Sequence, residues 1–553
     1  MARLTKLTVM NYRSVGDRIE VTLPRGVPLV LVGENNAGKS NIVRALDLLL
    51  GETWPGTHEP EDHEFWGRAP ERTIEITASF ENAGWYDRQG NCTGVLEKLR
   101  WTYRPTEEGD KCKFEAICTG GSAPRFVSNG TRDQCVCVVV GADRRLSYQL
   151  SYVSKWTLLS RLMRKFHGCL ISDPERVERL KNQFDTLKTI FAEVPEFAQF
   201  HEVLAQQFQQ TLLGMTYGLS VDFSAYDPSN FFHSLRVLPH EGGQARTFEE
   251  LGTGQEQLLA LAFAHAYAKA FHGGIILAIE EPEAHLHPLA QEWLARKIRE
   301  MCSDGLQIVL TTHSPAFVDI TGLEGLVLVR KENGATIVKQ VSADNLARFC
   351  VEHGARGERA RADTILPFYA SAATRDILAG LFAKKVVLVE GLTEQLALPV
   401  YLQATELDVV KEGIAVIAVD GKGNLAKWWR FFTAYGIPAY VLFDNDPNHD
   451  QEARKRRDLL RTIGLGNNEV DQAIAATDWR TCEAYSVFGE DFEKTLRGYF
   501  PGYAQLEDEG RAELGESKPL VARYVAERLP RDGAPGWDEF RRLADRIAAL
   551  GVR

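Results

Sequence analysis

The sequence predicts an α/β protein in which two units built on parallel sheets follow one another along the chain. Three observations support this fold class. An apolar strand, LVLV at 29–32, runs directly into the glycine-rich turn GENNAGKS and then into a helix. A second apolar strand, IILAIEE at 275–281, ends in two glutamates. From residue 385 onward, apolar runs alternate with helical segments, which is the β-α-β pattern of a small parallel sheet.

Length and composition indicate a multidomain globular protein. The chain has 553 residues, which predicts three or four domains at about 150 residues each. Apolar residues make up 44% of the chain, no apolar run approaches the ~18 residues of a membrane span, and the start MARLTKLTVM lacks a signal-peptide core. The nine cysteines include no C-x-x-C pair, so neither a zinc ribbon nor a disulfide framework is indicated. We therefore expect a cytoplasmic protein with no membrane partner.

The net charge of −11 argues against a protein that coats DNA non-specifically. It does not exclude a nuclease, because acidic metal ligands and local basic patches can coexist in one chain. The basic residues Lys384 and Lys385 and the basic run at 454–457 could contact a DNA backbone, or they could form solvated surface.

The first glycine-rich turn satisfies the pattern G-x-x-x-x-G-K-S between a strand and a helix, which is the context of a P-loop. Backbone N–H groups of such a loop, and the positive end of its helix, hold phosphates. Lys39 would reach the β and γ oxygens of a nucleotide, and Ser40 would ligate its magnesium ion. We predict an ATP site formed by Gly33, Asn35, Asn36, Gly38, Lys39, Ser40 and Asn41.

Three later segments supply groups that act on a bound nucleotide. Glu280 would lie near the magnesium ion, and Glu281 could orient or deprotonate the attacking water. The strand at 308–312 ends beside His313, which could sense the γ-phosphate, although a lone histidine is more often structural. The turn LGTGQ at 251–255 opens an apolar helix, so Gly252 and Gly254 form an anion-binding helix N-terminus. The nucleotide site of the same chain does not supply an anion for it.

Together these segments resemble the ATPase heads of the ABC and SMC-like class. The resemblance implies that the turn at 251–255 completes the site of a second head, and therefore a homodimer or a dimer of dimers. Gly252 and Thr253 stand where the usual LSGGQ signature has Ser-Gly, so the signature is matched in part. Between the P-loop and this turn, alternating segments at 73–80 and 99–140 predict a β lobe, and 154–214 predict helices that could mediate dimerisation or pack on their own core.

The second unit gathers acidic residues where its strands end. Glu390 follows one strand, with Glu394 one helical turn later, and Asp444 and Asp446 follow another. Such carboxylates repel one another and raise their own pKa values unless a cation neutralises them. Oxygen ligands without His or Cys favour Mg²⁺, Mn²⁺ or Ca²⁺ over zinc. Asp and Asn are also ordinary turn formers after a strand, so a simple turn is the alternative.

A glutamate after the first strand and D-x-D after the third are similar to the Toprim fold of topoisomerases, primases and certain nucleases. A P-loop head followed by a Toprim unit resembles the OLD family, named for overcoming lysogenization defect, and is similar to the Gabija-type nucleases. The shared strings are GENNAGKSN, IEEPEAHLHP, TTHSP, LVEG and FDND. The resemblance implies an ATP-dependent or ATP-regulated DNA endonuclease in defence against phage or mobile DNA, and it allows a companion defence protein such as a helicase. It also implies a late acidic ligand and a catalytic lysine, which we assign to Glu493 and Lys518.

The expected domains are residues 1–150 with the P-loop and β lobe, a helical insertion at 151–230, the remainder of the ATPase at 231–365, and a Toprim nuclease domain at 366–553. Two divalent ions held by the Toprim acids would bracket the scissile phosphate. ATP could drive cleavage or hold it off. Two other function classes stay open: an SMC-like DNA repair clamp, and a nucleotide-sensing scaffold of a defence complex. A topoisomerase would need a nucleophilic tyrosine in a DNA-gate domain, and no segment stands out for that.

Overall fold

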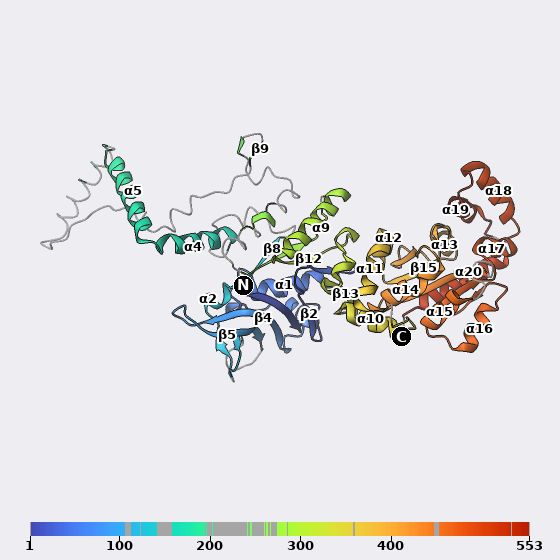
Figure 1. The fold of residues 1–553 in the computed structure, drawn as a ribbon, viewed down its shortest axis with the longest axis horizontal. Helices are drawn as coiled ribbons and strands as arrows, with labels where there is room; N and C mark the ends of the chain where they lie inside the picture. The colour runs from blue at the N-terminus through green and yellow to red at the C-terminus, as the bar shows by residue number, and fades with distance from the viewer. Residues whose placement is uncertain are drawn as a thin grey trace.

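The computed structural model describes residues 2–104, 112–121, 123–140, 157–193, 240–241, 244–245, 274–284, 286–357, 360–446, 453–531 and 533–551, with a few isolated positions between 195 and 266. Along the long axis in Figure 1, the amino-terminal unit with its helical projection is followed by a connecting segment drawn in yellow and then by the carboxy-terminal unit, orange to red. Among the helices of these ranges, none combines the length and the apolar character that crossing a membrane requires.

The first unit is built around a six-stranded sheet in the order β14-β13-β3-β12-β11-β8, called the nucleotide sheet below because the P-loop follows its strand β3. All neighbours run parallel except β13 and β14. The strands are β3 (Leu29–Val32), β8 (Cys135–Val140), β11 (Gly274–Glu280), β12 (Gln307–Thr311), β13 (Leu326–Glu332) and β14 (Ala335–Gln340).

Helices cover both faces of this sheet, which explains why its strands are continuously apolar. Leu29 and Leu31 point into a core shared with α1 (Lys39–Leu50), whereas Val30 and Val32 point into a core shared with α9 (Pro288–Ser303). The predicted α/β class is therefore confirmed for this unit.

A separate antiparallel sheet forms the predicted β lobe, in the order β2-β1-β4-β5-β6-β7. Its strands are β1 (Arg3–Met10), β2 (Ile19–Thr22), β4 (Ile74–Tyr86), β5 (Cys92–Tyr103), β6 (Cys112–Cys118) and β7 (Arg125–Phe126). One segment expected in this lobe lies elsewhere: β8 joins the nucleotide sheet beside β11, because all six of its residues are apolar and buried and suit a strand covered on both faces. Short 3-10 turns at Pro55–Thr57, Asp62–Glu64 and Trp66–Arg68, and helix α2 (Asn129–Arg132), complete the lobe.

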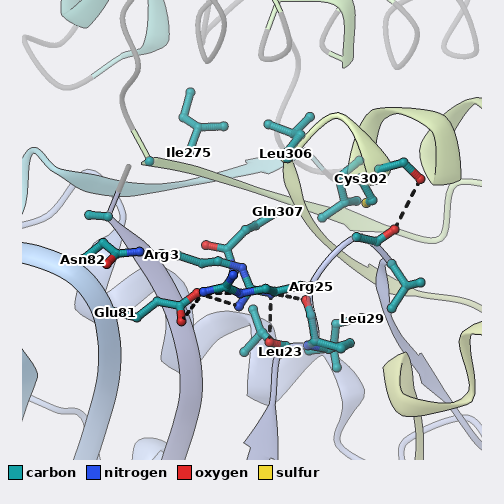
Figure 2. A pocket seen from close by; sticks show the side chains of 18 residues that line it. Arg3, Leu23, Arg25, Leu29, Glu81, Asn82, Ile275, Cys302, Leu306 and Gln307 are labelled. Carbon is teal, nitrogen blue, oxygen red and sulfur yellow. Dashed lines mark hydrogen bonds and ion pairs between the residues drawn. The ribbon is translucent and has the colours of Figure 1, made fainter.

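The edge of the nucleotide sheet opposite the P-loop has its own polar contacts. Arg3 and Arg25 both pair with Glu81, at 3.1 and 2.7 Å, and they line a cavity of about 410 Å³ (Figure 2). Of the predicted site residues that the structure describes, none lines this cavity.

The insertion contains two consecutive helices, α4 (Leu158–Ile171) and α5 (Pro174–Ala192), as its helical spacing predicts. Two short strands, β9 (His240–Glu241) and β10 (Gln244–Ala245), pair with each other. Apart from a few isolated positions, the part of the insertion that follows α5 lies outside the described residues, as does the turn at 251–255 with Gly252 and Gly254.

A short series of helices connects the two units: α10 (Ala343–Glu352), α11 (Ala362–Ala372) and α12 (Arg375–Ala379), followed by a 3-10 turn at Gly380–Phe382. Two further 3-10 turns, Pro315–Phe317 and Ile320–Gly325, lie between β12 and β13 and contact α12 and α11. One hydrophobic core runs through them from Leu310 on β12 to Val441 in the second unit. The two units therefore share packed side chains and are not joined by a free linker.

The second unit has a five-stranded sheet in the order β16-β15-β17-β19-β18. Its strands are β15 (Lys385–Val389), β16 (Ile414–Ala418), β17 (Ala439–Asp444), β18 (Arg480–Thr481) and β19 (Tyr485–Phe488), and only β18 is antiparallel. One face packs on α13 (Leu392–Ala404), α17 (Phe492–Tyr499), α18 (Tyr503–Leu514), α19 (Lys518–Arg528) and α20 (Pro535–Ala549). The other packs on α14 (Lys422–Ala434), α15 (Arg454–Thr462) and α16 (Asn467–Ile474). The β-α-β alternation predicted from residue 385 is confirmed.

Candidate functional site

Those predicted nucleotide-binding residues that the structure describes converge at one edge of the first sheet. Strands β3, β12 and β11 are parallel neighbours, so their carboxyl ends meet there. The Thr312 N–H donates to the carbonyl of Leu31 at 3.2 Å, and the Glu281 N–H donates to that of Thr311 at 2.9 Å. The P-loop, the acidic end of β11 and the His313 segment therefore face a common space.

Lys39 is buried inside its own loop. Its Nζ donates to the carbonyls of Gly33 at 2.9 Å and Glu34 at 2.8 Å. Burial lowers the pKa of Lys39 to about 8, against the opposing charges of Glu281 and Glu283. Phosphate oxygens would offer this ammonium stronger, charge-assisted partners than the two carbonyls.

Two residues that the sequence did not single out hold the P-loop from behind. Gly38 has φ 108°, and a Cβ there would lie 2.1 Å from Oγ1 of Thr336 on β14. This threonine donates to the Ala37 carbonyl at 2.8 Å and contacts Oγ of Ser14 at 2.7 Å. Asn41, predicted to contact nucleotide, donates its side-chain amide to Ser14 at 2.6 Å, so it braces the loop. Asn35 and Asn36 are exposed at the loop tip, and Ser40 is half-buried in the first turn of α1.

The predicted catalytic pair for ATP hydrolysis lies together. Nε2 of His313 is 3.8 Å from Oε1 of Glu281, which is exposed. Burial and the charge of Lys39 lower the pKa of His313, so the imidazole is neutral at physiological pH. Glu283, which the sequence analysis missed, orients this segment: it accepts hydrogen bonds from Oγ1 of Thr312 at 2.8 Å and from the His313 N–H at 2.5 Å.

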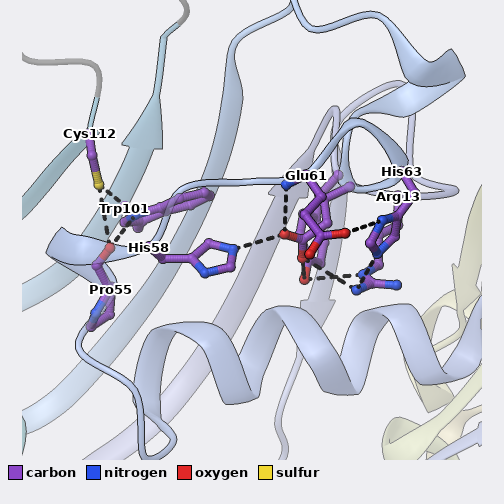
Figure 3. Close-up of polar contacts among 9 residues, drawn as sticks. Arg13, Pro55, His58, Glu61, His63, Trp101 and Cys112 are labelled. Atoms are coloured by element: carbon purple, nitrogen blue, oxygen red, sulfur yellow. Dashed lines mark hydrogen bonds and ion pairs between the residues drawn. The ribbon is translucent and has the colours of Figure 1, made fainter.

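Glu280 lines a cavity of about 370 Å³ together with Tyr12, Arg13 and His58. In the wall of this cavity, Arg13, His58 and Tyr12 all bond to the buried carboxylate of Glu64; Arg13 and His58 are labelled in Figure 3. Burial opposes ionisation of Glu64, but the hydrogen bond with His58 and the charge of Arg13 lower its pKa to about 2. This network fixes the 3-10 turns of 55–68 against the nucleotide site.

In the second unit, Glu390 and Asp444 meet at the carboxyl ends of β15 and β17. Oε1 of Glu390 accepts a hydrogen bond from the Asp444 N–H at 2.8 Å and lies 3.5 Å from Nζ of Lys422. Glu394 is buried, and its Oε2 accepts from the Gly391 N–H at 3.0 Å. Burial, with the charges of Glu390 and Glu493, raises the pKa of Glu394 to about 7.

The turn that carries Asp444 and Asp446 is held rigidly by the residue between them. Asn445 is buried, and its Nδ2 reaches the carbonyls of Ile474 at 2.8 Å and Ala476 at 2.7 Å. The Asp446 N–H donates to the Glu490 carbonyl at 2.9 Å. A simple solvated turn would need none of these contacts, which hold the backbone that carries the two aspartates in place.

The two late assignments, Glu493 and Lys518, line one cavity of about 200 Å³. Glu493 lies on α17, and its charge contributes to the raised pKa values of Glu394 and Asp444. Its neighbour Asp491 caps α17 by accepting from the Lys494 N–H at 2.7 Å. Lys518 is exposed at the first position of α19.

The donor chemistry of this second site fits a hard divalent cation. Burial and the charges of Glu390 and Glu394 raise the pKa of Asp444 well above its usual range. A cation would relieve this repulsion, and the donors are all oxygens. Within the described ranges, no three His, Cys, Asp or Glu side chains are gathered closely enough to form a metal-binding group. Glu390 faces Lys422 and Glu394 faces a backbone N–H, and an ion would take over these contacts.

Three lysines of the second unit lie at opposite ends of its strands: Lys384 and Lys385 at the amino ends, and Lys422 at the carboxyl ends near the acids. Lys384 directly precedes β15 and Lys385 is the first residue of that strand, at the edge opposite the acids, and Nζ of Lys385 donates to the Ile547 carbonyl at 3.3 Å. Lys422, which the sequence analysis passed over, is buried beside Glu390. Its sequence signal is a lysine between two glycines directly after a predicted strand, in the string DGKGN.

Comparison with known proteins finds two matching families. The model described as "Overcoming lysogenization defect protein-like, TOPRIM domain" matches residues 381–446, and the AAA ATPase domain matches residues 3–119 and 171–318. A protein called OLD nuclease from Thermus scotoductus is 28% identical over 503 residues, covering 86% of this chain and 89% of the relative. The Old nuclease of Escherichia phage P2 is 26% identical over 256 residues, covering 42% of this chain and 41% of the relative. Among solved structures, an Smc head domain from Pyrococcus furiosus is 14% identical and covers 64% of this chain and 99% of its own, with a TM-score of 0.37.

Proposed function

Because this chain belongs to the OLD family, with an AAA ATPase domain followed by an OLD-like Toprim domain, we propose that it is an ATP-binding, divalent-metal-dependent DNA endonuclease. The contact between Glu390 and Asp444 is the observation that carries this proposal. This contact brings two acids that are distant in the sequence together at a site separate from the P-loop. One chain would therefore hold one site for DNA cleavage and another for ATP hydrolysis.

In the nuclease site, Glu390, Glu394, Asp444 and Asp446 would hold the divalent ions, with Glu493 as a further oxygen ligand. Such ions lower the pKa of an attacking water and stabilise the leaving 3′ oxygen, which leaves a 5′ phosphate on the product. Lys518 shares a cavity with Glu493 and would place its positive charge against the scissile phosphate. The oxygen donors suit Mg²⁺, Mn²⁺ or Ca²⁺.

In the ATPase site, the backbone of the P-loop would bind the phosphates, and Lys39 would exchange its two carbonyl partners for β and γ oxygens. Ser40 and Glu280 would hold the magnesium ion. Glu281 would orient or deprotonate the attacking water, and the neutral imidazole of His313 would contact the γ-phosphate.

The biological setting is part of the same proposal. A defence role against phage or mobile DNA, a cytoplasmic location, a homodimer or dimer of dimers through the ATPase heads and a companion defence protein are each consistent with the family. ATP either drives cleavage or holds it off, and nicking rates measured with and without ATP distinguish the two.

Incubation of the full chain with supercoiled plasmid tests the proposal, using Mg²⁺ or Mn²⁺ with and without ATP. Nicking by the wild type that vanishes in Asp444→Ala, while Asp444→Ala still hydrolyses ATP, is the expected result. Lys39→Ala should lose ATP hydrolysis and keep the metal site. Absence of nicking in every condition would contradict the nuclease proposal and leave an SMC-like clamp or a nucleotide-sensing scaffold.

A further inference from the structure

A large basic cavity opens beside the Toprim acids, between the connecting helices α10 and α11 and the helices α14 and α15. It measures about 700 Å³. Among the described residues that line it, the single acidic side chain is Asp458. The basic side chains on its wall are Arg356, Lys422, Lys427, Arg430, Arg454 and Lys455. This concentration of positive charge stands out in a chain whose net charge is −11.

Lys422 belongs to both this cavity and the acidic site. It lines the cavity, and its Nζ lies 3.5 Å from Oε1 of Glu390. A ligand in the cavity would therefore reach the predicted metal ligands without crossing another element of the fold.

The cavity also receives two helix N-termini. Helix α14 begins at Lys422 and α15 begins at Arg454, and residues of both first turns line the wall. The unpaired N–H groups and the positive dipole end of a helix favour an anion, so they add to the charge of the side chains.

Several of the cations are held in place by the protein. Arg430 is buried and donates to the His353 carbonyl at 2.9 Å and to Thr462 at 2.5 Å. The ammonium of Lys427 lies 3.8 Å from the ring centroid of Phe368, which is also on the wall. Arg430 pairs with Asp458 at 3.4 Å and Lys422 with Glu390 at 3.5 Å. Fixed cations in a hollow repel one another, and an anionic ligand would stabilise them further.

We propose that this cavity docks the phosphate backbone of the DNA strand that enters the Toprim acids, with Lys422 next to the scissile phosphate. The inference rests on the proposed nuclease function. Lys and Arg contacts to phosphates position a nucleic acid without reading its sequence. The cavity is within the size range that holds small ligands, so it can take about one or two nucleotides of a strand.

Exposed residues at the mouth of the cavity give a clean test. We expect Lys455→Gln with Arg356→Gln to weaken binding of a labelled DNA duplex by about tenfold in an Asp444→Ala background, and to reduce the slope of log affinity against log salt by about one per contact removed. In the otherwise wild-type chain the same pair should raise KM for nicking with little change in kcat, and leave ATP hydrolysis unchanged. Lys411→Gln is the matched control, because Lys411 is exposed before β16, at the opposite edge of the sheet.

Lysine acetylation footprinting adds a readout that does not depend on substitution. DNA should protect Lys427 and Lys455 from acetylation and leave Lys411 reactive. Protection by free ATP but not by DNA would assign the cavity to a nucleotide and overturn the inference. An unchanged salt slope in the double variant of an enzyme that does nick DNA would also overturn it, while the nuclease proposal would stand. Protection by DNA in a chain that never nicks would support the docking site and contradict the nuclease.

Discussion

Glu390 and Asp444 are bonded to each other across two neighbouring strands: the carboxylate of Glu390 accepts the N–H of Asp444 at 2.8 Å. The contact forms because β15 and β17 are parallel neighbours whose carboxyl ends meet. One oxygen of Glu390 therefore fixes the backbone of the D-N-D turn, and in the proposed nuclease site its charge would also hold a metal ion.

Separating these two roles gives the first prediction. Glu390→Gln keeps an oxygen acceptor for the Asp444 N–H and removes the charge, so DNA nicking should fall at least about 100-fold while the melting temperature changes little. Glu390→Ala should lose nicking and also lower the melting temperature, because it leaves the N–H of Asp444 without this acceptor. Plasmid nicking and thermal unfolding, with the exposed Glu412→Gln as control, distinguish the two variants. Wild-type nicking in Glu390→Gln would contradict a metal-binding role.

The raised pKa of Glu394, about 7, makes metal binding depend on pH. A carboxyl group must lose its proton to ligate a metal, so the apparent affinity for Mg²⁺ or Mn²⁺ should be at least about tenfold weaker at about pH 6 than at about pH 8. Titration of each ion by calorimetry at the two pH values measures this. Glu394→Gln should bind the ions more weakly and show a smaller pH dependence, and an equal pH dependence in that variant would assign the effect to other groups.

The same group predicts how stability without metal varies with pH. Its folded pKa of about 7 lies above the ordinary 4.5, so the folded state binds more protons than the unfolded state between these values. Stability therefore falls as pH rises through this window, by on the order of 3 kcal/mol for a shift of about 2.5 pKa units. With chelator present, the wild type should melt at a lower temperature at about pH 8 than at about pH 6, and Glu394→Gln should lose much of that difference. If the melting temperatures of both proteins depend on pH to the same extent, Glu394 does not have the raised pKa.

Glu283 is predicted to support ATP hydrolysis through position and not through chemistry. It holds Thr312 and the backbone of His313, so Glu283→Ala should let the His313 segment move and lower kcat for ATP hydrolysis by about tenfold. Glu283→Gln keeps one acceptor oxygen and should recover part of the rate of ATP hydrolysis. If Glu283 instead acted as a base or a metal ligand, the neutral glutamine would not recover the rate. Glu300→Ala, an exposed glutamate on α9, is the control. A full loss of ATP binding in Glu283→Ala would point instead to contact with the nucleotide.

Local patterns predicted most of this fold, because each strand that is covered on both faces is continuously apolar and many of the site residues follow such a strand. The P-loop at Gly33 and Lys39, the acids of β11 and the pair Glu390 and Asp444 were all readable in this way. Segment β8 was assigned to the wrong sheet, because an apolar run does not state which partner it pairs with.

The residues that sequence reasoning missed act at long range. Ser14 and Thr336 support the P-loop from segments 322 residues apart, and Lys422 matters because folding brings it to Glu390. Glu283 and Asn445 bond to backbone groups that their own segment does not supply. Their partners follow from packing, which a single sequence does not state.

Arg330 links the nucleotide sheet to the Toprim sheet. Its guanidinium donates to the carbonyls of Lys384 and Gly436, both at 2.8 Å, just before β15 and β17 begin. The residue before it, Val329, packs so closely against P-loop residue Gly33 that a Cβ on that glycine would lie 2.0 Å from the Val329 carbonyl oxygen. A shift of the P-loop strand on nucleotide binding would therefore be passed to the amino ends of two strands whose carboxyl ends carry Glu390 and Asp444.

Arg330→Ala should remove this link without touching either site. We expect ATP hydrolysis, and nicking in the absence of ATP, to stay within about twofold of wild type, while the ratio of nicking rates with and without ATP moves toward one. Arg330→Lys can donate to one carbonyl but not span both as the planar guanidinium does, so it should give an intermediate ratio. The neighbouring exposed Lys331→Ala is the control, since it changes a charge on the same strand. If the ATP effect survives intact in Arg330→Ala, the coupling runs through the shared core between β12 and β17 and not through this arginine.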